Sequence, residues 1–200
     1  MAGNNLQRWT IDTSEYLIED KHLTLRVDSC TTPGGGHVDK YFVLEYNDWV
    51  NCLVIDAENN AIVLRHYRHG AQTYLMELVS GSMEPEDASP EAGIRRELEE
   101  ELGYTGGELF QVGISYPNPA SQTNKVYSFL AVGGNLTKHQ NLEPGESLLI
   151  EKIPFGKLLE DFSSSNTLHQ SLHIATLFFA IAFINRSPAA SVQHLKQHTE

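Results

Sequence analysis

The sequence predicts an α+β fold, an α/β/α sandwich in which a mixed β-sheet lies between helices. Three observations lead to this expectation. Short runs rich in β-branched and aromatic residues recur along most of the chain, a central helix carries a dense acidic run, and a long apolar helix lies near the C-terminus. Because the strands outnumber the helices and do not alternate regularly with them, a doubly wound parallel sheet is not expected.

The strands are expected where such runs are bounded by turn residues. They fall at residues 9–28 (a strand pair), 41–46, 49–55, 61–66, 74–79, 109–115, 126–132 and 148–153. Pro33 and the three glycines after it interrupt the chain after the first pair, and the polar run at residues 56–60 supplies a turn.

Helix signals are strongest around residues 92–102. Ser89 is a suitable N-cap, Pro90 suits the first helical position, and Gly103 suits the C-terminal stop. A second long helix is expected at residues 167–184, where His173 reads as a surface or core residue rather than a catalyst.

Composition excludes several classes of protein. The chain has 200 residues, of which 40% are hydrophobic, so it can bury a core for one domain with a small appendage. Its formal net charge of −12 argues against binding to nucleic acid or to a membrane surface. The polar N-terminus and the shortness of the apolar stretch at residues 173–184 lead us to expect a soluble, cytoplasmic protein.

The central helix carries the most informative side chains. Glu97, Glu100 and Glu101 are spaced i, i+3 and i+4, which places three carboxylates on one helical face. Like charges at this spacing repel, and a bound divalent cation would reverse the penalty. Oxygen ligands suit Mg²⁺, and also Mn²⁺. The alternative, open from the residues alone, is a solvated acidic face.

The surrounding residues resemble the Nudix family of hydrolases, whose signature is G-x5-E-x7-R-E-U-x-E-E-x-G-U with U apolar. Residues 96–104 match its second half, with Tyr104 as a loose fit at the last apolar position. The resemblance implies a Nudix-type fold. It also implies that Glu97, Glu100 and Glu101 hold catalytic metal ions, and that Arg96 braces them by charge-assisted hydrogen bonds.

The first half of the signature departs from the family pattern. Its glutamate position falls on Ala88 and its glycine position on Ser82, whereas the glycine of this chain is Gly81. The loop therefore carries one extra residue, and Asp87 or Glu86 could substitute for the missing glutamate. This departure keeps open a non-catalytic nucleotide-sensing module as an alternative to an enzyme.

The flanking residues narrow the resemblance to ADP-ribose pyrophosphatases and related nucleoside-diphosphate-sugar hydrolases. Residues 63–70 and 77–81 are similar to the V-R-Q-Y-R and E-L-P-A-G segments of that branch. The resemblance implies that Arg68, with Arg65 as a second candidate, holds a phosphate. It further implies that Glu77 contacts the substrate or braces the arginine, and that the Ser80 carbonyl is a metal ligand.

Two loops complete the resemblance. Pro119 lies where the branch has a proline-containing loop that shapes the pocket, and Glu146, with Glu143 in reserve, lies where it has a general-base glutamate. We expect residues 1–40 to form a β segment that pairs across a homodimer, and residues 41–200 to form the hydrolase domain.

The activity implied is Mg²⁺-dependent cleavage of a nucleoside-diphosphate sugar such as ADP-ribose to a nucleoside monophosphate and a sugar phosphate. Another nucleotide substrate, such as a dinucleotide or a nucleoside triphosphate, is the alternative within the family.

Overall fold

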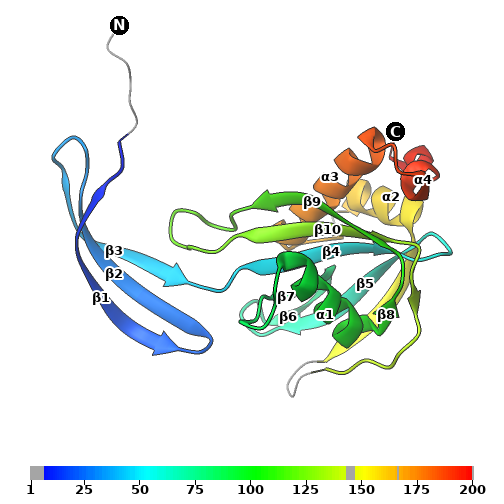
Figure 1. Cartoon of the computed structure of the whole chain (residues 1–200), viewed down its shortest axis with the longest axis horizontal. Helices are drawn as coiled ribbons and strands as arrows, with labels where there is room; N and C mark the ends of the chain where they lie inside the picture. Colours follow the sequence, from blue (N-terminus) through cyan, green and yellow to red (C-terminus); the bar gives the residue numbers. More distant parts are fainter. Residues whose placement is uncertain (1–6, 143–146, 166, 200) are drawn as a thin grey trace, which may run out of the picture. The chain divides into compact units, whose positions relative to one another are not determined.

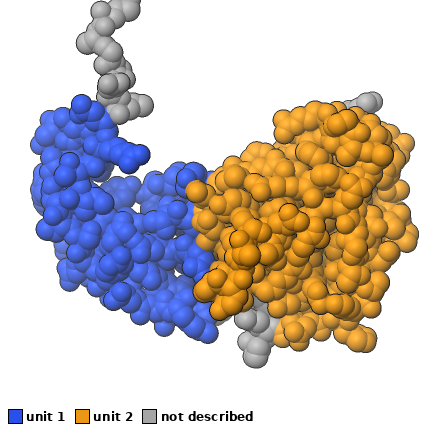
Figure 2. Space-filling model, in the orientation of Figure 1, with its two compact units in different colours: residues 1–47, 116–124 blue, residues 48–115, 125–200 orange. Residues whose placement is uncertain are grey.

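The computed structural model describes residues 7–142, 147–165 and 167–199. The chain divides into two compact units (Figure 2). The first comprises Met1–Asn47 with Tyr116–Asn124, and the second comprises Asp48–Ser115 with Lys125–Glu200.

The first unit is built on an antiparallel sheet in the order β1-β2-β3 (Figure 1). Its strands are β1 (Thr10–Asp20), β2 (Leu23–Thr31) and β3 (His37–Glu45). The strand pair expected at residues 9–28 is confirmed, and the third strand begins four residues earlier than expected. Every residue of β1 is exposed, including large apolar side chains such as Leu17.

The second unit holds a mixed sheet in the order β12-β5-β4-β10-β9. β4 and β10 are parallel, whereas the other adjacent pairs along this order are antiparallel. The strands of this order are β4 (Trp49–Ile55), β5 (Asn60–Arg68), β9 (Glu108–Ser115), β10 (Val126–Val132) and β12 (Leu148–Pro154). β8 (Tyr104–Thr105) and β11 (Asn135–Leu136) form a separate small pair.

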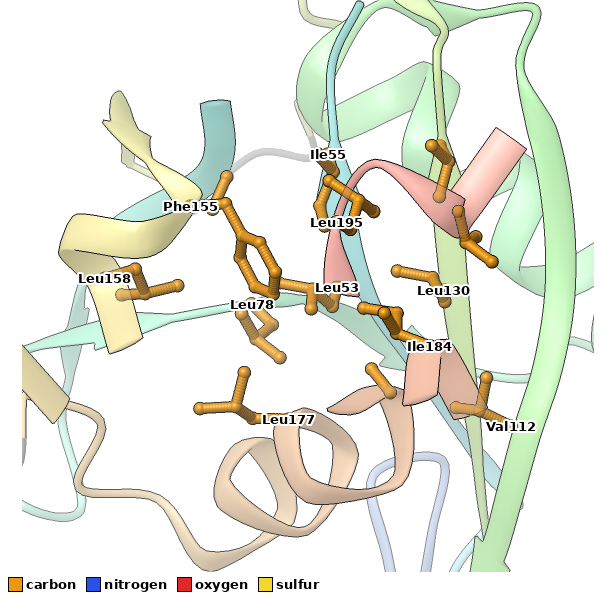
Figure 3. Packing of buried hydrophobic residues seen from close by; sticks show 14 of the residues in the cluster. Leu53, Ile55, Leu78, Val112, Leu130, Phe155, Leu158, Leu177, Ile184 and Leu195 are labelled. Carbon is orange, nitrogen blue, oxygen red and sulfur yellow. The ribbon is translucent and has the colours of Figure 1, made fainter. Parts of the chain in front are cut away.

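Helices cover both faces of this sheet, as the alternation along β4 shows. Val50, Cys52 and Val54 belong to the apolar cluster of α1 (Pro90–Leu102), whereas Leu53 and Ile55 belong to the cluster of the C-terminal helices. Figure 3 shows Leu53 and Ile55 among side chains of the cluster that includes the C-terminal helices. The C-terminal helices are α2 (Phe155–Ser165), α3 (Ser171–Arg186), α4 (Ala190–Gln193) and the 3₁₀ turn η1 (Lys196–His198). The predicted α+β sandwich is confirmed.

Within the described residues, no single helix is long and apolar enough to cross a membrane. Only the bent pair Ser171–Arg186 and Ala190–His198 meets that requirement together, by length and composition alone.

The structure differs from the expectations in three places. The strand expected at residues 74–79 is two strands, β6 (Thr73–Glu77) and β7 (Val79–Ser82), because the chain leaves its pairing with β5 at Leu78 and pairs with β4 instead. α2 was not expected, and α3 begins at Ser171 rather than at residue 167. The split of β6 from β7 sets Ser80 and Gly81 beside Asn51 and Val50 on β4.

Candidate active site

The end signals of α1 act as the sequence predicted. The Ser89 hydroxyl accepts a hydrogen bond from the Ala92 N–H at 3.2 Å, and Pro90 occupies the first helical position. Gly103 adopts a left-handed conformation with φ of 61°, and its N–H donates to the Glu99 carbonyl at 2.8 Å. With Leu98 and its apolar neighbours buried against the sheet, the helix cannot rotate, so its polar face is fixed.

Arg96 joins that polar face to the preceding loop. Its Nη1 donates to Glu97 Oε1 at 2.9 Å and to Glu100 Oε2 at 3.0 Å. Its Nη2 donates to the Ser82 carbonyl at 3.0 Å and to Asp87 Oδ2 at 3.1 Å. One guanidinium therefore draws two helix carboxylates together and holds the loop against them.

Asp87 supplies the loop carboxylate that the family pattern places at residue 88. Its side chain is buried, and besides the bonds from Arg96 its Oδ2 accepts from the Glu84 N–H at 2.9 Å. The hydrogen bond from Arg96 holds the pKa of Asp87 below its ordinary value, so the group stays ionised. Of the two candidate substitutes, Asp87 therefore makes the brace, while Glu86 is exposed.

Gly81 lies directly under the Glu97 carboxylate. A Cβ atom at residue 81 would lie 1.9 Å from Glu97 Oε1 and 2.1 Å from its Cδ, so only glycine leaves room for this carboxylate. Residue 81 is thus a point of close contact between strand β7 and a side chain of helix α1.

The donor set fits a hard divalent cation. No group of three or more His, Cys, Asp or Glu side chains forms a ready-made metal cluster in the described part of the chain. Glu97 and Glu100 nevertheless converge on one nitrogen atom, and Glu101 is buried with 6% exposure. Mg²⁺ is commonly held by one or two carboxylates together with substrate phosphates, so two neighbouring carboxylates suit it.

Arg68 is held by Glu77. Its Nε donates to Glu77 Oε1 at 2.8 Å and its Nη2 donates to Oε2 at 2.7 Å. The Glu77 side chain is 2% exposed, whereas that of Arg68 is 38% exposed. Of the two roles considered for Glu77, bracing the arginine is the one this geometry favours. Arg65 instead donates to Glu151 at 2.8 Å on the neighbouring strand β12.

A pocket of about 430 Å³ adjoins these groups. It is lined by Trp49, Asn51, Arg68, Ser80, Gly81, Ser82, Gln170, Leu172 and His173, and so unites predicted residues with others that sequence reasoning missed. Arg65 is not among its lining residues. The missed residues are Asn51, Gln170 and His173, and the one signal for them was the amide of Asn51 inside an otherwise apolar strand.

Two predicted loop residues remain, Pro119 and Glu146. Pro119 belongs to Tyr116–Asn124, a part of the first unit, where the Ser121 N–H donates to the Asn118 carbonyl at 3.0 Å in a turn. Glu146 and its reserve Glu143 lie outside the described residues.

Comparisons with known proteins identify the family and the fold. A family model described as NUDIX domain matches residues 46–165, and one described as nucleoside diphosphate sugar hydrolase N-terminal domain matches residues 9–44. The ADP-ribose pyrophosphatase of Bacillus subtilis (strain 168) is 28% identical over 127 residues, 64% of this chain and 67% of that protein. A solved ADP compounds hydrolase has the same fold, with a TM-score of 0.77 at 18% identity over 90% of this chain and 96% of that chain.

Proposed function

The chain belongs to the Nudix family of pyrophosphohydrolases, and we propose that it cleaves the pyrophosphate bond of a nucleoside-diphosphate sugar such as ADP-ribose with the help of Mg²⁺. Its products are a nucleoside monophosphate and a sugar phosphate. One observation carries the proposal. Of the two carboxylates gathered by Arg96, that of Glu97 lies against Gly81, and Gly81 lines the same pocket as the phosphate-binding candidate Arg68.

The metal ligands in this proposal are Glu97, Glu100, Glu101 and the Ser80 carbonyl, with Mn²⁺ as a possible replacement for Mg²⁺. A bound divalent cation neutralises diphosphate oxygens and makes water a stronger nucleophile at neutral pH. It also lets a chain with a net charge of −12 accept an anionic substrate.

The chain's own residues position the substrate. Arg68, preorganised by Glu77, binds one phosphate of the substrate and stabilises negative charge that develops there. Arg96 keeps Glu97 and Glu100 close together, with the Glu97 carboxylate against Gly81 of the pocket. Glu146 is the proposed general base, Arg65 a second cationic candidate, and Pro119 a candidate for shaping the pocket.

The choice of substrate class has two supports. The match to the N-terminal domain of nucleoside diphosphate sugar hydrolases covers most of the first unit. The curated relative at 28% identity is an ADP-ribose pyrophosphatase, which makes ADP-ribose the first compound to test.

The test is phosphatase-coupled phosphate release with Mg²⁺ from ADP-ribose, ADP-glucose, GDP-mannose, UDP-glucose and NADH. Glu100→Gln is compared with Glu99→Gln, whose parent side chain is 56% exposed and pairs with Lys138 rather than with Arg96. We expect one nucleotide sugar to be hydrolysed, with turnover falling by orders of magnitude in Glu100→Gln and persisting in Glu99→Gln.

Other outcomes of this assay count against the proposal. Turnover of NADH without turnover of any nucleotide sugar would indicate that the protein is a dinucleotide pyrophosphatase. If the protein binds a nucleotide of the panel but hydrolyses none with either Mg²⁺ or Mn²⁺, it is a nucleotide-sensing module and not an enzyme.

We also propose that the protein is a homodimer paired through β1. This strand lies at the edge of its sheet and exposes Leu17 at 50% together with further large apolar side chains, and such surfaces are typical of protein interfaces.

Sedimentation velocity tests the dimer, and Leu17→Glu should shift the protein toward monomer. Leu149→Glu, the same change at a side chain of the second unit that is 65% exposed, should stay dimeric. A monomeric wild type at micromolar concentration would refute the proposal.

A further inference from the structure

The pocket beside Gly81 contains polar atoms that lack partners. Asn51 Nδ2, Gln170 Oε1 and both ring nitrogens of His173 are buried and make no hydrogen bond to any described residue. Asn51 and His173 are each 1% exposed. Buried polar side chains are nearly always hydrogen-bonded, and an unsatisfied one destabilises the fold. Three such residues lining one pocket therefore call for a ligand.

Three elements bring these side chains to the pocket. Asn51 lies on β4 between Ser80 of β7 and Ser128 of β10, in the register of the sheet. Gln170 and His173 lie at the start of α3, which packs on β4 and β10. The same pocket is lined by Ser80, Gly81 and Arg68, so its polar wall is continuous with the candidate phosphate and metal site.

The hydrogen-bonding capacity of this wall is mixed and uncharged. Burial, with a smaller effect from the positive charge of Arg68, lowers the pKa of His173 to about 3, so its imidazole is neutral at neutral pH. A neutral imidazole has one donor and one acceptor, Asn51 Nδ2 donates, and Gln170 Oε1 accepts. A hydroxyl group both donates and accepts, whereas a phosphate at neutral pH mainly accepts. The wall therefore matches hydroxyl groups better than a phosphate.

We propose that Asn51, Gln170 and His173 bind the hydroxyl groups of the sugar half of the substrate, and so determine which sugar the enzyme accepts. The inference rests on the proposed function and identifies the sugar subsite of the same pocket. With the sugar in this position, its attached phosphate lies toward Arg68 and Ser80, which line the remainder of the pocket. A site built to hydrogen-bond substrate hydroxyls discriminates strongly against analogues that lack them, because its buried polar groups are then left unpaired.

The test measures binding of the products without metal or turnover. Isothermal titration of the full chain uses ribose 5-phosphate, glucose 1-phosphate and mannose 1-phosphate as sugar probes, with inorganic phosphate as the reference. We expect Asn51→Leu and His173→Leu each to weaken the sugar phosphate that binds the wild type by about tenfold, as the loss of one or two hydrogen bonds predicts. Binding of inorganic phosphate should change little.

Thermal unfolding separates a ligand role from a structural one. Because Asn51 and His173 lack partners, replacing either by leucine should leave the melting temperature of the free protein unchanged or raise it. Thr176→Val is the matched control on α3. The Thr176 hydroxyl is buried and donates to the Leu172 carbonyl at 3.0 Å, and it lies 2.8 Å from Ser128 Oγ. This control should lower the melting temperature and leave sugar-phosphate binding intact.

Two results would overturn the inference. One is that no sugar phosphate binds the wild type more tightly than inorganic phosphate does. The other is that both leucine variants bind the sugar phosphate as the wild type does. Failure of hydrolysis alone would sink the proposed activity but not this subsite, since binding is read without turnover.

Discussion

Lowering the pH from 7 to 5 should destabilise the ligand-free protein through His173. This imidazole is 1% exposed in the third position of α3, where burial and, to a smaller extent, the positive charge of Arg68 oppose its protonation. Its pKa is about 3 in the folded protein, against an ordinary value of 6.5. Below pH 6.5 the unfolded chain takes up a proton that the folded chain refuses, so protonation favours unfolding.

The size of the effect follows from this difference in proton uptake. The stability that neutral His173 contributes is fully present above pH 6.5, and it is lost progressively as the pH falls toward 3. Each pH unit well below 6.5 costs about 1.4 kcal/mol, and integration from pH 7 to pH 5 gives about 2 kcal/mol. The lowered pKa values of Asp28, Asp56 and Asp87 act in a lower range, below about pH 4.

Urea unfolding at pH 7 and pH 5 measures the loss. The wild type should lose about 2 kcal/mol more than His173→Gln, whose amide does not titrate in this range. His169→Gln is the control, because His169 is exposed in the segment just before α3, and it should keep the wild-type pH dependence. The same loss in the wild type and in His173→Gln would refute the argument that His173 is buried in its neutral form.

Three further changes test the site. Gly81→Ala places a Cβ 1.9 Å from Glu97 Oε1, so the carboxylate must move, and Mg²⁺-dependent turnover should fall by more than tenfold; unchanged turnover would contradict the close contact. Asp87→Ala removes one of the carboxylates that pair with the Arg96 guanidinium and should lower the free energy of unfolding by about 1–3 kcal/mol. Glu86→Ala, at an exposed position, should change it by no more than about 0.5 kcal/mol. Equal effects of the two substitutions would exclude Asp87 as the brace. Chelation with EDTA should abolish hydrolysis, and added Mg²⁺ should restore it; activity that survives chelation would exclude a metal role for Glu97 and Glu100.

The parts of the fold that sequence predicted best depend on local signals. The bounds of α1 follow from Ser89, Pro90 and Gly103, each of which acts on its own backbone neighbours, and all three have the expected roles. Strands β4 and β10 have the expected bounds because each is a short, mostly apolar run, interrupted by one small polar residue, Asn51 or Ser128, of the kind found in a buried strand. Such features require no knowledge of distant residues.

The errors arose where pairing between distant residues decides the structure. Residues 73–82 form two strands because the first part pairs with β5 and the second part with β4. Nothing in the mostly apolar run at residues 74–79 marks Leu78 as the point where the partner changes. The start of α2 has no capping residue before it, although its apolar positions at 155, 158, 159 and 162 follow a helical period. The absence of a capping residue therefore led to this helix being missed, although its apolar residues follow a helical period.

The site was predictable to a similar extent. Glu97 and Glu100 are three residues apart on one helix, so their spacing alone places them on one face, whereas the role of Arg96 came from the resemblance to the family. The pair of Arg68 and Glu77 and the wall of Asn51 and His173 bring together residues that no local pattern connects. The first pair was reached only through resemblance to a family, and the second was not reached at all.

The departure of the loop from the family pattern shows how a non-matching sequence can preserve a contact. Asp87 precedes the expected glutamate position by one residue, and its side chain is one methylene shorter, so its carboxylate must approach α1 closely to reach Arg96. Gly93 eases this approach, because a Cβ there would lie 3.0 Å from Asp87 Oδ2, and the carboxylate would have to shift by a few tenths of an ångström. Glycine inside a helix costs about 0.5–1 kcal/mol relative to alanine. The close approach of Asp87 offsets that cost through its hydrogen bonds with Arg96, the residue that gathers the carboxylates proposed to bind metal. The extra loop residue, the shorter acid and the glycine thus act as one structural unit, and the missing glutamate at Ala88 is not by itself a sign of lost activity.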